Sequence, residues 1–87
     1  MEYKPGMLAK SIAGHDQNNI YVIMQEAGDF VFLCDGRLKT IEKQKRKRKK
    51  HIQLIKTIPE ELAVKLAEGS VIKNEDIRKA IGWKAHV

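Results

Sequence analysis

The feature that most restricts how this chain can fold is a run of cations at residues 43–50, with seven lysines and arginines in eight positions and no acid. No apolar residue stands between Ile41 and Ile52, so a helix through the run would have no stripe to pack. Cations four positions apart would also repel one another along a helix. The run therefore predicts a mobile loop, or the splayed ends of strands, between two segments that both read as β-strands.

The positive charge of the chain is concentrated around this run. Residues 37–56 contain ten cations and one acid, a net charge of +9, whereas the rest of the chain carries −3 and the whole chain +6. Such a cluster attracts the nucleic-acid backbone through Coulomb energy and counterion release. The alternative is a loop that is merely solvated, but like charges without acids between them destabilise a free fold unless a partner compensates them. We therefore expect a polyphosphate partner, with RNA as the leading choice.

The segments around the run are short and rich in β-branched and aromatic residues, and they are separated by turn-forming residues. Predicted strands occupy residues 7–12, 20–25, 30–34, 37–41 and 51–55. Asp35-Gly36 is a strong hairpin signal because glycine readily adopts positive φ. Five short strands within residues 7–55 favour a mainly β protein built as a small barrel.

Two short helices are predicted after the strands. One begins near Thr57-Ile58-Pro59-Glu60 and ends at Gly69, and a second is capped by Asn74 and ends at Gly82. Helices this short are marginal in water, so we expect them to pack within the chain. The predicted organisation is a barrel at residues 1–57, with a basic loop at 43–50, and a helical extension at 58–87.

Composition narrows the classes of function. A chain of 87 residues supports one small domain. The lone Cys34 excludes an intramolecular disulfide framework, and no stretch resembles a signal peptide or approaches the ~18 apolar residues of a membrane span. The sequence contains no metal-ligand spacing, phosphate-cradling loop or nucleophile motif. We expect a cytoplasmic, non-catalytic protein with no cofactor, no metal, no small-molecule substrate and no membrane partner.

Several motifs resemble the KOW-domain proteins. Residues 6–23 resemble the strand, Gly-x-Asp loop and strand of the KOW motif, and Asp35-Gly36-Arg37, the run at 43–50 and His51-Ile52 follow the order found in the large-subunit ribosomal KOW protein of archaea and eukaryotes. Residues 74–80, Asn-Glu-Asp-Ile-Arg-Lys-Ala, resemble the terminal helix of its short bacterial relatives. The likeness thus extends over nearly the whole chain.

This resemblance implies an SH3-like five-stranded KOW barrel, here with two short C-terminal helices, that binds ribosomal RNA of the large subunit as part of the translation machinery. The chain departs from the family at Gln17-Asn18-Asn19, where a glycine or a cation usually follows the loop aspartate, and at Gln44-Lys45, where Pro-Lys is common. Asparagine tolerates left-handed φ, so Asn18 or Asn19 can replace the glycine in the turn.

The candidate RNA-binding residues are the cations and histidines in and around the run and beside the Gly14 loop. They are Arg37, Lys39, Lys43, Lys45, Arg46, Lys47, Arg48, Lys49, Lys50, His51, Lys10 and His15. If the seven cations of the run each neutralise one phosphate, the slope of log K against log salt should be about −5 on a single strand and about −6 on a duplex.

The remaining aromatic residues allow other interpretations. Tyr3, Tyr21, Phe30 and Phe32 could stack on RNA bases, but aromatics make up only 6% of the chain, so we expect most of them in the core. Trp83 either seals a helix against the barrel or belongs to a partner site. One alternative function is therefore a KOW module that docks on transcription or translation proteins through its C-terminal helices. Another is attachment to anionic lipid through the polybasic run, for which the sequence supplies no second anchoring signal.

Overall fold

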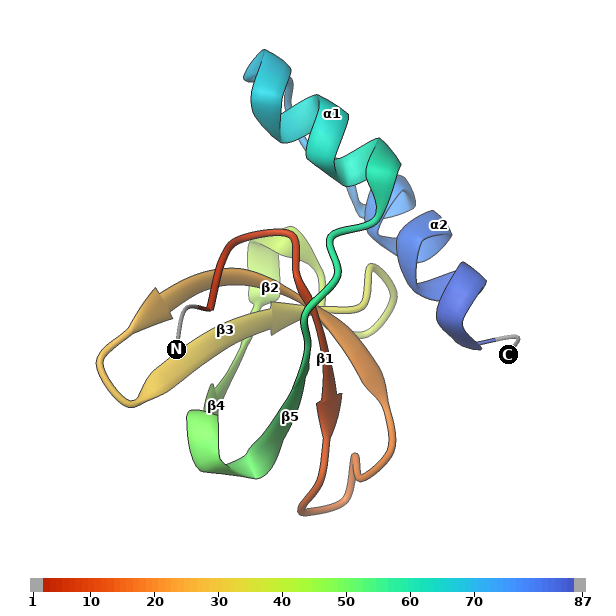
Figure 1. Ribbon diagram of the computed structural model, residues 1–87. Helices are drawn as coiled ribbons and strands as arrows, with labels where there is room; N and C mark the ends of the chain where they lie inside the picture. Colours follow the sequence, from red (N-terminus) through yellow and green to blue (C-terminus); the bar gives the residue numbers. More distant parts are fainter. Residues whose placement is uncertain (1–2, 86–87) are drawn as a thin grey trace.

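The computed structural model describes residues 3–85 of the chain and the side chains of residues 3–82. Five antiparallel strands form one open sheet, and two helices follow it in the chain (Figure 1). The elements, including the 3-10 turns η1 and η2, are β1 (Leu8–Ser11), β2 (Ile20–Ala27), β3 (Phe30–Cys34), η1 (Ile41–Lys43), β4 (Lys45–Arg48), η2 (Lys49–His51), β5 (Ile52–Ile55), α1 (Glu60–Glu68) and α2 (Asn74–Ala85). The strand order is β4-β3-β2-β1-β5, so the two edge strands are consecutive in the chain and only η2 separates them.

Both faces of the sheet carry buried residues, and successive residues of a strand point to opposite faces. In β2, Tyr21 and Ile23 face one side and Val22 faces the other. The first side holds an inner cluster that consists of Ala9, Tyr21, Ile23, Val31, Leu33 and Ile52. The second side holds a helix-side cluster that consists of Leu8, Val22, Cys34, Leu62, Ile77 and Ala80.

The helices pack on the sheet, which confirms the expectation that they pack within the chain. Leu62 of α1 and Ile77 of α2 are buried in the helix-side cluster. Figure 1 shows both helices on one side of the sheet, with the β2–β3 hairpin extending away from them. The helices therefore cover only part of this face.

The two helices end differently. Gly69 terminates α1 with a left-handed φ of 72°, as predicted. The prediction that Gly82 ends the second helix is wrong: α2 continues to Ala85, and Gly82 is absent from the glycines with positive φ among the described residues. No proline follows Gly82, and a helical glycine costs only about 1 kcal/mol relative to alanine.

Asn74, predicted as a helix cap, ties α2 to the turn η1 instead. Its Oδ1 accepts a hydrogen bond from the N–H of Ile41 at 2.9 Å. The capping role falls to Asp76, whose Oδ2 accepts from the N–H of Lys73 at 2.9 Å. A second link is the hydrogen bond from Arg78 Nη1 to the carbonyl of Gly36, at 2.7 Å.

The prediction of a fourth strand at residues 37–41 is wrong. Asp35 Oδ1 accepts hydrogen bonds from the N–H groups of Arg37, at 2.8 Å, and Lys39, at 2.9 Å. These donors close a compact turn and so are not available to a strand ladder. Leu38, an apolar residue within this segment, is 85% exposed.

The fourth strand is instead the centre of the cationic run, which was predicted as a loop. Lys45–Arg48 form β4 and pair antiparallel with β3, while η1 and η2 flank the strand. A strand places alternate side chains on opposite faces, so it divides the cations into two groups instead of stacking them all on one surface. The structural reason that this strand forms lies in what the two groups contact.

Candidate nucleic-acid interface

The inward-facing residues of β4 are Lys45 and Lys47. Their register partners on β3 are Leu33 and Val31, which belong to the inner cluster. The side chains of these lysines are 29% and 10% exposed, respectively. Long methylene stems allow a lysine to cover apolar surface while its ammonium group finds a polar partner.

That partner is Asp16, in the loop between β1 and β2. Lys47 Nζ lies 2.9 Å from Asp16 Oδ1, and Lys45 Nζ lies 3.0 Å from Oδ2. The same carboxylate accepts hydrogen bonds from Ser11 Oγ and Tyr21 OH, each at 2.9 Å. Burial alone would raise the pKa of Asp16, but the hydrogen bonds from Lys47, Lys45, Ser11 and Tyr21 hold this pKa well below its usual value of 3.8. Asp16 is therefore an ionised hub that joins this loop to β4.

The β1–β2 loop is shaped to present this carboxylate. Gly14 has a φ of 88°, and Asn18 has a φ of 76°, which confirms that asparagine takes the left-handed position in the turn. Lys47 Nζ also donates to the carbonyl of Ala13 at 2.9 Å. The lysine thus holds both the loop backbone and the acid that the loop carries.

Outward-facing cations of β4 form a different arrangement with the aromatic residues of β3. Arg48 pairs in register with Phe30, and Arg46 pairs with Phe32. The guanidinium carbons of Arg46 and Arg48 lie 4.6 and 4.9 Å from the centroid of the Phe30 ring, within the range of cation–π attraction. Both arginines are exposed. Within residues 3–85, no carboxylate forms an ion pair with either of them.

The prediction that Phe30 and Phe32 lie in the core is wrong. Both are partly exposed, and neither belongs to the inner or the helix-side cluster. They lie on the same face of β3 as Cys34, beyond the part that the helices cover. The alternation of aromatic residues in one strand and cations in its neighbour is the sequence signal that could have identified this face. Tyr21 is buried in the inner cluster and Tyr3 packs against it, as expected.

The two cations that follow β4, Lys49 and Lys50, have different surroundings. Lys49 pairs with Glu26, and its Nζ lies 4.8 Å from the centroid of the Tyr3 ring. Lys50 is exposed. A cleft of about 330 Å³ opens beside the β2–β3 turn, and its lining residues are Asp29, Arg48, Lys49 and Lys50. The backbone N–H of Lys49 donates to the carbonyl of Asp29 at 2.8 Å, which fixes η2 against the turn.

The other predicted site residues lie outside the β4 strand. Arg37 and Lys39 are in the turn that follows β3, at the opposite end of that strand from Phe30. Lys43 is exposed at the end of η1. His15 is exposed in the β1–β2 loop, whereas Lys10 in β1 and His51 in η2 are partly buried.

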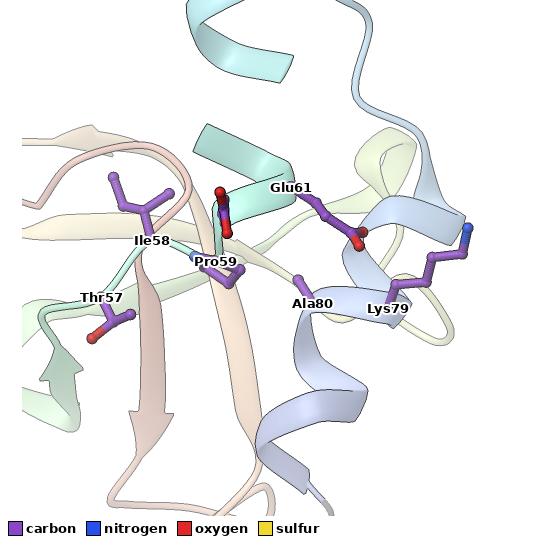
Figure 2. A pocket seen from close by; sticks show the side chains of 7 residues that line it. Thr57, Ile58, Pro59, Glu61, Lys79 and Ala80 are labelled. Atoms are coloured by element: carbon purple, nitrogen blue, oxygen red, sulfur yellow. The ribbon is translucent and has the colours of Figure 1, made fainter. Parts of the chain in front are cut away.

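A separate cavity of about 500 Å³ lies between the β5–α1 connection and α2 (Figure 2). Its lining residues are Thr57, Ile58, Pro59, Glu60, Glu61, Lys79 and Ala80. In Figure 2, Glu61 extends from α1 and Lys79 from α2 on one side of it. Both side chains are exposed, so no buried polar group is aimed into this cavity. The Trp83 side chain, considered above for this region, lies outside the described side chains.

Metal-ligating side chains and the single cysteine are further candidates for a site among the described residues. No group of three or more His, Cys, Asp or Glu residues in the described chain is placed to hold a metal ion. Cys34 Sγ donates to the carbonyl of Thr40 at 3.2 Å. Burial, with smaller contributions from Asp35 and Glu42, raises the pKa of Cys34 to about 11, so its thiol stays protonated at neutral pH.

Neither the protein-family models nor the curated proteins contain a match to this chain. Across the described residues, the helices are too short and too polar to cross a bilayer. Function must therefore be argued from the geometry of the chain itself.

Proposed function

We propose that this protein is a non-catalytic RNA-binding protein of the KOW type, whose sheet edge and flanking turns lie along the phosphates of ribosomal RNA in the large subunit. Five short antiparallel strands support the SH3-like interpretation, which the sequence resemblance suggested. Support for RNA comes mainly from the exposed Arg46 and Arg48, which form no ion pair with the described carboxylates and lie on a strand that is anchored from its other face.

The anchoring changes how many cations are available to RNA. Three of the seven cations in residues 43–50 are paired with acids: Lys45 and Lys47 with Asp16, and Lys49 with Glu26. The other four, which form no ion pair within residues 3–85, are Lys43, Arg46, Arg48 and Lys50. If these four neutralise phosphates, the slope of log K against log salt becomes about −3 on a single strand and about −4 on a duplex.

Electrostatics of this kind supplies affinity and orientation with little sequence preference. Binding to phosphates requires cations that are exposed, whereas cations that face the sheet must be paired with an acid. Alternation along β4 provides both from one run, because the paired lysines face the inner cluster and the arginines face solvent.

The test measures RNA affinity by fluorescence anisotropy across a series of salt concentrations. The double variant Arg46→Gln/Arg48→Gln should weaken binding to all RNAs and make the single-strand slope shallower by about 1.4. Lys73→Gln/Lys79→Gln removes the same charge from exposed positions just before and within α2, and it should change the slope much less. A flat salt dependence of the wild-type protein, or an equal loss in both double variants, would refute the proposal.

Docking on a protein is one of the alternative functions that the sequence allows, and the cavity of Figure 2 together with the exposed Val64 on α1 is where it would occur. Association with ribosomal particles distinguishes the two functions. Loss of association after nuclease treatment supports RNA binding, whereas association that persists supports protein docking.

A further inference from the structure

The outer face of the β3–β4 pair has the chemistry of a nucleobase platform. Unpaired bases in RNA are commonly held by stacking on aromatic rings or on the planes of arginine guanidinium groups. Here Phe30 lies within 5 Å of two such groups, those of Arg46 and Arg48, at 4.6 and 4.9 Å. Attraction between the ring and the cations limits their freedom, so less entropy is lost when a base stacks on them.

A cationic cleft adjoins this platform. Arg48 contributes to both, since its guanidinium lies over Phe30 and its side chain also lines the cleft of about 330 Å³ with Lys49 and Lys50. A stacking surface next to a pocket of cations matches the two parts of a nucleotide, the planar base and the phosphate. Asp29 lines the same cleft, and its carboxylate opposes an anion there.

We propose that this face binds single-stranded RNA by stacking an unpaired base on the Phe30–Arg46–Arg48 platform, with a neighbouring phosphate in the cleft. The inference rests on the proposed function and adds a preference for unpaired over paired RNA. Bases in a duplex are already stacked on one another, so a duplex gains only the phosphate contacts.

Position on the sheet supports this assignment. Phe30 and Phe32 are on the helix-side face of the sheet but outside its buried cluster, and their register neighbours on β2, Ala27 and Gln25, are both exposed. These two residues therefore do not cover the platform. Lys45 and Lys47 hold β4 from below through Asp16, so the platform stands on a fixed support.

The experiment compares affinities for a twelve-nucleotide oligouridine and for a twelve-base-pair RNA duplex. Phe30→Leu keeps an apolar strand residue but removes the ring, and it should weaken oligouridine binding about tenfold while changing duplex binding less than twofold. Phe30→Trp, which keeps an aromatic ring at this position, should bind oligouridine about as tightly as the wild-type protein. Phe32→Leu is the matched control, because it removes a ring from the same face at a position without a cation–π contact among the described residues.

A further variant tests the cleft. Asp29→Asn should tighten oligouridine binding severalfold, because it removes the only acid among the residues lining the cleft. Melting temperatures of all variants establish that they are folded.

Three results overturn the inference. If Phe30→Leu weakens both RNAs equally or neither, or if Phe32→Leu matches its effect, no base stacks on the platform. If Asp29→Asn changes nothing, the cleft holds no phosphate. Failure of the proposed function looks different, because the wild-type protein would then bind neither oligouridine nor the duplex at low salt.

Discussion

Substitution of Asp16 is the most direct test of how β4 is held in place. Asp16→Asn leaves the size of the side chain almost unchanged but removes the negative charge that Lys45 and Lys47 share. Lys47, whose side chain is 10% exposed, would keep only uncharged acceptors, the Ala13 carbonyl and the amide oxygen at position 16. Lys45 is more exposed and can turn toward water.

The size of the effect follows from these contacts. Breaking a buried ion pair by removing one partner costs about 3–5 kcal/mol, because it leaves an uncompensated charge. The flexibility of both lysines reduces that figure, and we expect a loss of about 3 kcal/mol in the free energy of unfolding. A domain of this length has about 4–13 kcal/mol in total, and its melting temperature falls about 4–8 °C per kcal/mol. The expected decrease in melting temperature is therefore about 12–24 °C.

The matched control is Glu26→Gln, which also removes the acid that pairs with a lysine of the cationic run. The Glu26 side chain is 39% exposed, so its pair with Lys49 should contribute less than about 1 kcal/mol. Urea unfolding, monitored by circular dichroism, measures both variants. If Asp16→Asn falls within 1 kcal/mol of Glu26→Gln, Asp16 does not organise the strand and the reasoning fails.

Two further predictions concern the same scaffold. Since the fold lowers the pKa of Asp16 below its usual 3.8, the stability that ionised Asp16 contributes should be complete above about pH 5 and should be lost as the pH falls below 3.8. The melting temperature should therefore fall at acid pH, and it should fall less in Asp16→Asn. An equal fall in both proteins would contradict the assignment. Gly36→Ala should destabilise the protein by about 1–3 kcal/mol more than Gly28→Ala. Both glycines have positive φ, but a Cβ at Gly36 would lie 2.5 Å from the main-chain carbonyl oxygen of Asn74, whereas a Cβ at Gly28 would meet no atom within 4 Å. Equal unfolding midpoints of the two variants would refute this prediction.

Local sequence predicted much of this fold. Four of the strands and the starts of both helices follow from β-branched segments, turn residues and an early proline, which act over a few positions. Asn18 was identified as a residue suited to left-handed φ for the same reason, since that preference belongs to the asparagine side chain itself.

The misplaced fourth strand depended on contacts between distant residues. Ile41 donates its N–H to Asn74, 33 residues later, so the segment before it has no reason to continue as a strand. Lys47 reaches Asp16 across 31 residues, and this contact between distant residues helps to hold a run without apolar residues as a strand. Neither pairing leaves a local signal in hydrophobic periodicity.

The candidate site was predicted in its charge but not in its arrangement. The sequence shows where the seven cations of residues 43–50 lie, but it does not show which of them are paired with acids and which face solvent. The structure separates them by the identity of the residue opposite each one on β3, which is apolar and inward for Lys45 and aromatic and outward for Arg48. Phe30 was assigned to the core because its position relative to the helices could not be known from the sequence.

The two-residue repeat of β4 makes the cationic run sensitive to its reading frame. Inserting a single amino acid before Arg46 would leave the overall charge almost unaltered, yet it would aim arginines at Asp16 and lysines at Phe30. Two chains with the same net charge would then differ in which cations their outer surface exposes. Whether a cation stands at an odd or an even position of the strand decides which face it occupies, and a count of lysines and arginines does not show this.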